Sequence, residues 1–424
     1  MIKSVHFLNY RGFEDFSLDL VEGTNLLIGD NASGKTTIIR GLAAVLSSFF
    51  LGMSTRNTKF LGLDHDDFRI VKSDEHLGED LPVEVKFTFL DKDGTLRLNS
   101  SKGGRTQTKP LSNIKKLSKK FLDDLNGDKV VSLPLICCYS TNIHSSRKIS
   151  KGKFKEYFLQ RTFGYYECLR GHGFLEHWTK RLLVLKEGDK GELEIEGIRK
   201  AISRVLGIEG CGVISDIDIR PNASKVFYLF VDGRESETQH LSDGYQRIVN
   251  IVLDMSFRCM ILNGSEFGVE ALEKTKGTVL IDEIDLHLHP SLQSVVLASL
   301  RSTFSNIQFI ITSHAPLVMS GLYSDNKNVI YRLEYDVLEK LYVGEKVNAY
   351  GLDVSKIMEI ILNITPRSKE VDVQLSKLFK LIDSDEFVNA KEILENMREK
   401  FGDNLPELFE AQSMIEFMEH DSDS

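Results

Sequence analysis

The segment GDNASGKT at residues 29–36 constrains the fold of this chain more than any other stretch. It matches G-x-x-x-x-G-K-[ST] at every fixed position, follows the apolar run 24–28, and precedes a helical pattern from residue 35 to about residue 50. Such an order of strand, glycine loop and helix surrounds phosphate groups with backbone N–H groups and the positive end of a helix dipole. The sequence therefore predicts an α/β fold that binds a nucleotide at this loop.

Two side chains of the loop have the clearest predicted roles. Lys35 is expected to neutralise the β and γ phosphate oxygens, and the hydroxyl of Thr36 is expected to bind Mg²⁺. ATP and Mg²⁺ are thus the predicted cofactors. The other nucleotide-binding candidates in the loop are Asn31, Ala32, Ser33, Gly34 and Thr37.

A second apolar run, TVLI at 278–281, ends in the adjacent carboxylates Asp282 and Glu283. Beside a phosphate loop, such a strand places one carboxylate near the metal and the next near the γ phosphate. Asp282 is therefore predicted to bind Mg²⁺, and Glu283 is predicted to be the general base that activates water. Because 247 residues separate Lys35 from Asp282, the intervening chain is expected to form a second lobe.

Two further motifs flank this acidic strand, one before it and one after it. LSDG at 241–244 lies at the start of a helical pattern, with Ser242 forty residues before Asp282, and TSH at 312–314 ends the next apolar strand. This order resembles the ABC-class ATPases. The resemblance implies that His314 is the switch histidine, that Asp285 belongs to the D-loop, and that Ser242 and Gly244 complete the ATP site of an opposite chain. It therefore implies a homo-oligomer built on head-to-tail ATPase dimers.

The sequences YRGF at 10–13, LHLHP at 286–290 and SHAP at 313–316 resemble the RecF, SMC and OLD branch of this class. By this resemblance, Arg11 lies over the phosphate or base side of the nucleotide. The resemblance covers residues 1–50 and about 225–345. No Q-loop glutamine follows the apolar strand 133–139, and Asn142 is a candidate substitute.

The predicted fold class is α/β: a bilobed ABC-type ATPase head whose mixed sheet has a parallel core, with a helical insertion and a helical C-terminal region. Apolar runs separated by helices after residue 245 indicate the parallel strands. The predicted domains are the first part of the head at 1–140, a mainly helical insertion at 141–224, the second part of the head at 225–345, and a partner-docking region with an acidic tail at 346–424.

Several sequence features typical of this branch are not found here, and this excludes some of the functions of the branch. There is no long heptad array, so the chain is not predicted to be a coiled-coil tether. A metal-dependent nuclease domain is not expected either, because Asp383-Ser384-Asp385 lies between two helical patterns and is interpreted as a helix cap. His287 and His289 lack nearby Cys or further His partners, so a metal site there is not predicted.

Helical patterns are predicted at 354–364, 370–382, 387–401 and 407–419. The arrangement of Tyr350-Gly351 followed by these helices resembles the PtuA ATPases of Septu and retron-linked anti-phage systems, a family whose partner is a separate HNH nuclease. This resemblance implies an ATP-binding or ATP-hydrolysing sensor and assembly subunit that regulates such a nuclease. Two alternatives stay open. One is a RecF-like DNA repair ATPase without a nuclease partner, and the other is a nearly inactive ATP-bound scaffold.

Charge is unevenly distributed along the chain. The net charge is −9, and residues 367–424 hold seven Lys or Arg against fifteen Asp or Glu. The basic segments 102–120 and 147–155 are interpreted either as solvated faces or as contacts to DNA or RNA phosphates. No apolar run is long and charge-free enough for a membrane span, and neither a secretory signal nor a disulfide framework is recognised, so a cytoplasmic protein is expected.

Overall fold

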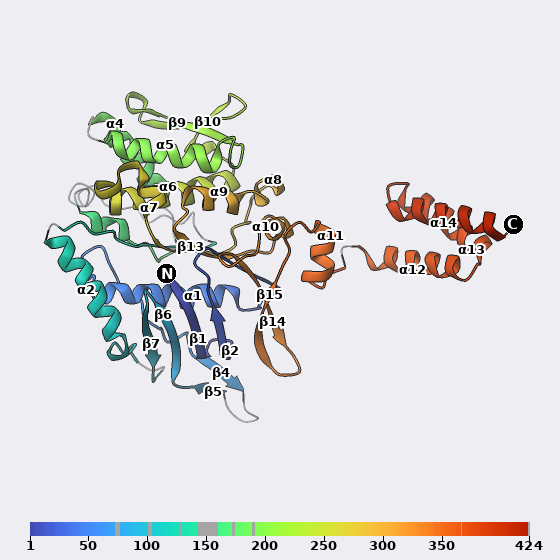
Figure 1. The fold of residues 1–424 in the computed structure, drawn as a ribbon, viewed down its shortest axis with the longest axis horizontal. Helices are drawn as coiled ribbons and strands as arrows, with labels where there is room; N and C mark the ends of the chain where they lie inside the picture. Colours follow the sequence, from blue (N-terminus) through green and yellow to red (C-terminus); the bar gives the residue numbers. More distant parts are fainter. Residues whose placement is uncertain are drawn as a thin grey trace. The chain divides into compact units, whose positions relative to one another are not determined.

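The computed structural model describes residues 1–72, 77–100, 104–127, 129–141, 160–171, 174–188, 191–365 and 367–422. These residues form two compact units, Met1–Ile357 and Met358–Ser424. Figure 1 shows the order of the elements in each unit. The predicted nucleotide site lies wholly within the first unit.

A six-stranded sheet forms the centre of the first unit, in the order β15-β14-β3-β13-β12-β8. Its strands from β14 to β8 are parallel, and only the edge strand β15 runs antiparallel. The inner strands are buried along their whole length, which explains their continuous apolar sequences. The predicted α/β class with a mixed sheet and a parallel core is confirmed. The strands are β3 (Thr24–Gly29), β8 (Leu135–Tyr139), β12 (Gly277–Ile281), β13 (Ile307–Thr312), β14 (Val329–Asp336) and β15 (Leu341–Val347).

Helices cover both faces of this sheet (Figure 1). Helix α1 (Lys35–Ser47) follows the phosphate loop on one side, while α6 (Asp243–Phe267) and α9 (Val296–Thr303) lie on the other. Within α6 and the following turn, residues 243–274 are long and apolar enough to cross a membrane, but 89% of their most apolar window is buried inside the protein. This helix is therefore the core helix of the fold.

A second sheet is antiparallel, with the order β2-β1-β6-β7. Its inner side chains alternate with exposed ones, and Phe7 of β1 packs against Gly41 of α1. Strands β6 and β7 form a hairpin whose turn is Leu90-Asp91, both at positive φ. The strands are β1 (Ile2–Tyr10), β2 (Phe13–Asp19), β6 (Val83–Phe89) and β7 (Lys92–Leu98).

The segment between the two halves of the head contains helices and a small sheet. Helices α4 (Leu175–Glu187) and α5 (Glu192–Leu206) lie in the range predicted to be mainly helical, and the range also contains the strand β9 (Ile214–Arg220). Strand β9 pairs with β10 (Lys225–Phe230), which pairs with β11 (Glu235–Glu237). Trp178 of α4 contacts the buried ion pair of α6 that is described below.

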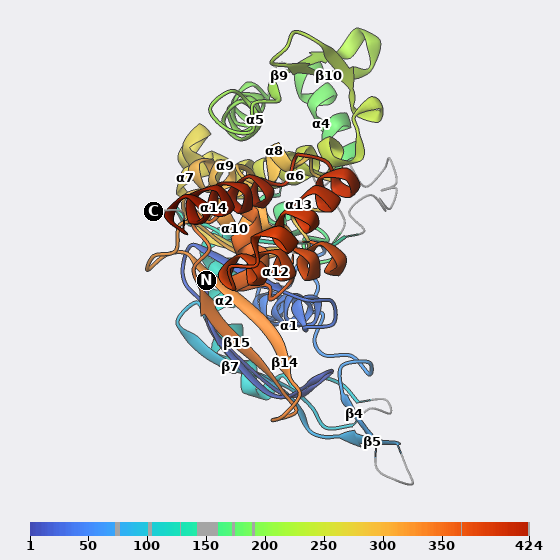
Figure 2. The same cartoon turned by 90° about the vertical axis from the view of Figure 1, so that its right-hand side faces the viewer.

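The second unit is a bundle of three helices with its own apolar core (Figure 2). The helices are α12 (Lys369–Asp383), α13 (Phe387–Phe401) and α14 (Pro406–Ser422), each within three residues of a predicted helix. Ser384 is the C-cap of α12, so the predicted cap at 383–385 is confirmed.

The remaining elements, apart from the 15-residue helix α2, are short. They are η1 (Ser48–Leu51), β4 (Arg69–Lys72), β5 (Leu77–Asp80), η2 (Lys109–Leu111), α2 (Ser112–Asn126), η3 (Arg161–Tyr165), η4 (Pro221–Ala223), η5 (Thr238–His240), η6 (Gly268–Glu270), α7 (Ala271–Lys274), α8 (Pro290–Gln293), α10 (Pro316–Ser320), α11 (Val354–Lys356) and η7 (Ile357–Ile361).

Candidate nucleotide site

The phosphate loop connects the end of β3 with the first residue of α1, as the motif predicts. Lys35 is buried, and its amino group donates hydrogen bonds to the carbonyl oxygens of Gly29 (2.9 Å) and Asp30 (2.7 Å). Burial lowers the pKa of Lys35, while the nearby carboxylates of Glu283 and Asp282 partly oppose this shift. The loop backbone therefore curves around the charged amino group of Lys35 and binds it through two carbonyl oxygens.

Asp282 lies at the end of β12, directly beside the first turn of α1. Its carboxylate accepts hydrogen bonds from the hydroxyls of Thr36 (3.1 Å) and Thr312 (2.7 Å). Oxygen ligands of this kind, a hydroxyl and a carboxylate, are what Mg²⁺ prefers. The two predicted metal ligands, Thr36 and Asp282, therefore lie next to each other and fit a magnesium ion.

Glu283 adopts an unusual backbone conformation, with φ at 52°. A side chain with a Cβ atom strains the backbone there by about 1–3 kcal/mol, so neighbouring groups must hold it in place. Its N–H donates to the hydroxyl of Thr312 (2.7 Å), and its carbonyl oxygen accepts from the guanidinium of Arg247 (2.9 Å). Strand β13 and helix α6 thus fix the direction of the Glu283 side chain together.

Arg247 is a residue that the sequence analysis did not single out. Its guanidinium is buried and also donates to the carbonyl oxygens of Asp282 (2.6 Å) and Ser140 (3.3 Å). Burial lowers its pKa, opposed by the carboxylates of Glu283 and Asp282. The available signal was its place in the LSDGYQR segment, five residues after Ser242.

A cavity of about 350 Å³ joins the phosphate loop to two of the predicted catalytic residues. Glu283 and His314 lie on its wall together with the loop, although they come from different strand ends. The backbone N–H of His314 donates to the carboxylate of Asp285 (3.4 Å), which connects the D-loop to the end of β13. The lining residues are Gly12, Phe13, Asn31, Ala32, Ser33, Gly34, Lys35, Thr36, Thr37, Glu283, His314 and Tyr342.

Arg11 does not line this cavity. Its guanidinium donates to the carboxylate of the buried Asp67 (2.7 Å), and its backbone N–H donates to the Asp67 carbonyl oxygen (3.0 Å). The guanidinium is thus held by Asp67, and the predicted position of Arg11 over the nucleotide stays a prediction.

Ser242 and Gly244 also lie away from the phosphate-loop cavity of their own chain. Ser242 is the N-cap of α6, and Gly244 lies against the backbone of His287, where an added Cβ would come within 2.2 Å of a carbonyl oxygen. Only glycine allows this approach. The start of α6 is thus packed directly on the segment that contains Asp285.

The remaining candidates from the sequence lie away from the cavity or outside the described residues. His289 caps α8 by accepting a hydrogen bond from the N–H of Ser291, which gives it a structural role. Among the described residues, no group of three or more His, Cys, Asp or Glu is arranged to hold a metal ion. Asn142 and the basic segment 147–155 lie outside the described residues, as do residues 102 and 103.

The described part of the first basic segment contains α2. This helix exposes the lysines at positions 115, 116, 119 and 120, and it was not predicted as a helix. The structure contains no nucleic acid, so a contact to DNA or RNA through these lysines stays a prediction.

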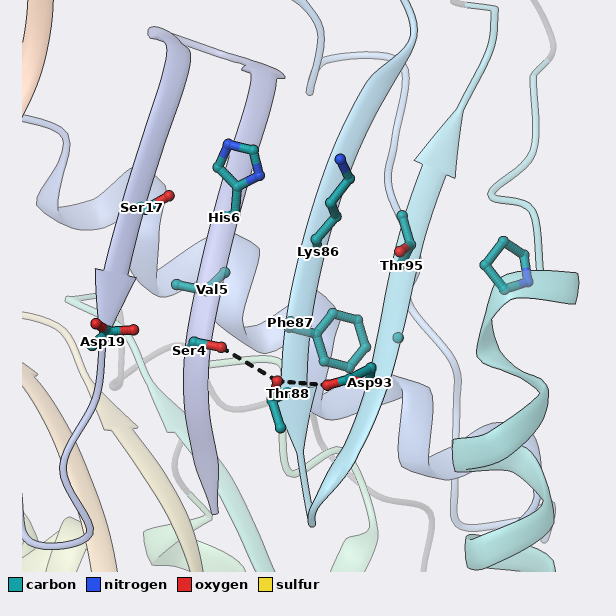
Figure 3. A pocket seen from close by; sticks show the side chains of 12 residues that line it. Ser4, Val5, His6, Ser17, Asp19, Lys86, Phe87, Thr88, Asp93 and Thr95 are labelled. Carbon is teal, nitrogen blue, oxygen red and sulfur yellow. Dashed lines mark hydrogen bonds between the residues drawn. The ribbon is translucent and has the colours of Figure 1, made fainter.

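A separate cavity of about 560 Å³ lies over the outer face of the antiparallel sheet (Figure 3). Within it, Ser4 donates to the hydroxyl of Thr88 (3.3 Å), which donates to Asp93 (2.7 Å). None of the predicted site residues lines this cavity. It is therefore distinct from the nucleotide site.

A buried ion pair connects α6 to its surroundings. The carboxylate of Asp254 accepts hydrogen bonds from Arg258 (2.6 Å), from the hydroxyl of Tyr139 (2.7 Å) and from the indole of Trp178 (2.7 Å). Both charged side chains are 1% exposed. Burial and the Asp254 charge raise the pKa of Tyr139, which keeps its hydroxyl as a donor. Strand β8, helix α4 and helix α6 therefore share one polar centre.

Comparisons with known proteins agree with this architecture. Two family models match the chain: "AAA domain" over residues 4–202 and "AAA domain, putative AbiEii toxin, Type IV TA system" over residues 140–320. The phosphate loop falls in the first match and the acidic strand end in the second. These matches, together with relatives that are named probable ATPases, identify the chain as an ATPase.

Its relatives identify the branch. The "Retron Ec83 probable ATPase" of Escherichia coli is 25% identical over 77% of this chain and 70% of its own length. The "Septu protein PtuA" of Bacillus thuringiensis is 24% identical over 86% of this chain and 84% of its own length. An Smc head domain from Pyrococcus furiosus is 13% identical over 85% of this chain and 98% of its own, with a TM-score of 0.47. The predicted resemblance to PtuA is confirmed, and RecF proteins are also among the relatives.

Proposed function

We propose that this chain is the ATP-binding and ATP-hydrolysing subunit of an anti-phage defence complex, in which it senses nucleotide and regulates a separate HNH-type nuclease. The observation that carries the ATPase part is the single cavity in which the phosphate loop meets Glu283 and His314. The likeness to a Septu protein and to a retron ATPase over most of the chain supports the defence role. A cytoplasmic location fits this proposal.

The chemistry assigned to the site is hydrolysis of the terminal phosphate of ATP. Glu283 accepts a proton from water as the water oxygen forms its bond to the γ phosphorus, and the bond to the bridging oxygen breaks to release ADP. Lys35 and the loop N–H groups bind the phosphates, and His314 contacts the γ phosphate. A magnesium ion held by Thr36 and Asp282 supplies charge neutralisation when it is bound.

The second half of the site is assigned to a second copy of the chain. Ser242 and Gly244 lie outside the cavity of their own chain, and the helix N-terminus that they form suits a phosphate. We place this N-terminus, together with Asp285, against the nucleotide of an opposite chain. The working assembly is then a head-to-tail dimer or a multiple of it.

A mixing experiment tests this composite site. Lys35→Ala chains and Ser242→Arg chains are each expected to be inactive, but a mixture is expected to recover activity because each mixed dimer contains about one intact site. Phosphate release by the separate and mixed chains is the measurement. A mixture of proven mixed dimers that stays inactive would contradict the arrangement.

The nuclease partner is tested by isolating the tagged chain from its native cells. A stoichiometric protein with an HNH motif is expected, and its cutting activity should differ between complexes that contain wild-type or Glu283→Gln chains. Isolation of an active ATPase that retains duplex DNA but no nuclease would instead favour the RecF-like alternative.

A further inference from the structure

Tyr342 lies in the wall of the nucleotide cavity, although it is separated from the phosphate loop by about 300 residues of sequence. It belongs to β15, the edge strand of the central sheet. Its hydroxyl donates a hydrogen bond to the carbonyl oxygen of Ala32 in the loop (3.3 Å). None of the motifs described above includes this residue.

The ring of Tyr342 also contacts the loop through a second aromatic side chain. It packs edge-on against Phe13, with the ring centroids 4.9 Å apart and the planes at 82°. The Phe13 ring in turn lies against Gly34, where an added Cβ would be 2.6 Å from it. Tyr342 therefore reaches the loop at two points, directly at Ala32 and through Phe13 at Gly34.

Both points have backbone conformations that residues with a Cβ rarely adopt. Ala32 has a φ of 67° and Gly34 a φ of 91°, both in the left-handed region. Alanine carries a Cβ, so its left-handed conformation is unfavourable unless the surroundings hold it. The contacts from Tyr342 and Phe13 supply that support from outside the motif.

We propose that Tyr342 is a positioning residue for nucleotide binding: it holds the phosphate loop in its binding shape through Ala32 and Phe13. This inference rests on the proposed function of the cavity as an ATP site. It makes ATP affinity depend on the β14–β15 hairpin, the part of the sheet nearest to the C-terminal unit in sequence. Since Glu283 and His314 are held by other elements, the effect falls on binding and not on the chemical step.

The test measures affinity for two probes, ATP and inorganic tripolyphosphate, each with magnesium, by titration calorimetry. Tyr342→Phe, which lacks only the hydroxyl, is expected to bind both probes about threefold to tenfold more weakly. Tyr342→Ala, which also lacks the ring, is expected to weaken both by a larger and equal factor, because the loop and not the base is affected. In turnover assays KM should rise while kcat stays within about twofold.

A matched control is available on the same hairpin. Tyr335 packs against Tyr342 with ring centroids 5.1 Å apart, is 47% exposed, and does not line the cavity. Tyr335→Ala removes an aromatic ring from the hairpin without removing a contact to the loop. It is expected to bind both probes as the wild type does.

Three results would overturn the inference. Wild-type affinity in Tyr342→Ala would mean that the contact has no role, and loss of ATP affinity with unchanged tripolyphosphate affinity would make Tyr342 a nucleoside contact. Equal losses in Tyr335→Ala and Tyr342→Ala would indicate only a disturbed hairpin. Failure of the wild type itself to bind ATP would contradict the proposed function, and so would be told apart from all three.

Discussion

Replacing Glu283 by glutamine is expected to lower ATP turnover by about 10²- to 10⁴-fold while ATP binding is retained. The amide has nearly the same size as the carboxylate, and the contacts that fix this residue run through its backbone, to Thr312 and Arg247. The variant should therefore keep its geometry and lose only the group that accepts the proton. Phosphate release and binding of a fluorescent ATP analogue measure the two properties separately.

The control for this experiment is Lys35→Ala. The lysine side chain is expected to bind the phosphates in the ground state, so the alanine variant should lose ATP binding itself and not only turnover. Substantial phosphate release by Glu283→Gln would remove Glu283 as the general base and direct attention to His314, which also lines the cavity.

Replacing Asp254 by alanine is expected to lower the free energy of unfolding by about 3–5 kcal/mol. The substitution leaves the guanidinium of Arg258 buried without its carboxylate, and it also removes the acceptor used by Tyr139 and Trp178. Urea unfolding followed by tryptophan fluorescence is a direct measurement, because Trp178 is the only tryptophan of the chain and lies at this centre.

An exposed ion pair provides the control for the Asp254→Ala substitution. Glu270 and Lys274 are more than half exposed, so Glu270→Ala should change the unfolding free energy by less than about 1 kcal/mol. A double variant, Asp254→Leu with Arg258→Met, should recover part of the loss since it removes both charges together. If Asp254→Ala were no more destabilising than Glu270→Ala, the buried pair would not be the polar centre that holds α6 in place.

The parts of the molecule that the sequence predicts are those whose structure is determined by residues close together in the sequence. The loop at 29–36 specifies its own strand and helix, and the carboxylates at 282 and 283 follow an apolar run that is buried along its whole length. The three C-terminal helices have clear helical spacing of apolar residues, and they were predicted nearly to their ends.

The missed features depend on distant parts of the chain. Arg247 contacts three carbonyl oxygens from two strand ends, and Tyr342 contacts a loop from the opposite end of the sequence. Neither contact is marked by a sequence periodicity or by a fixed spacing between motifs. Arg11 illustrates the same limit, since its contact with the buried Asp67, 56 residues further along the chain, follows no motif.

The strand order of the central sheet determines when the site can form as the protein is made. Strand β3 leaves the ribosome early, but its two neighbours, β13 and β14, begin at Ile307 and Val329. At about 5–20 residues per second, roughly 15–60 s pass between synthesis of the loop and synthesis of β14. Until residue 307 is made, β3 has no partner strand on either side. Translation that stops before that residue therefore yields a polypeptide that contains the whole phosphate loop but neither of the strands that hold β3 in the sheet.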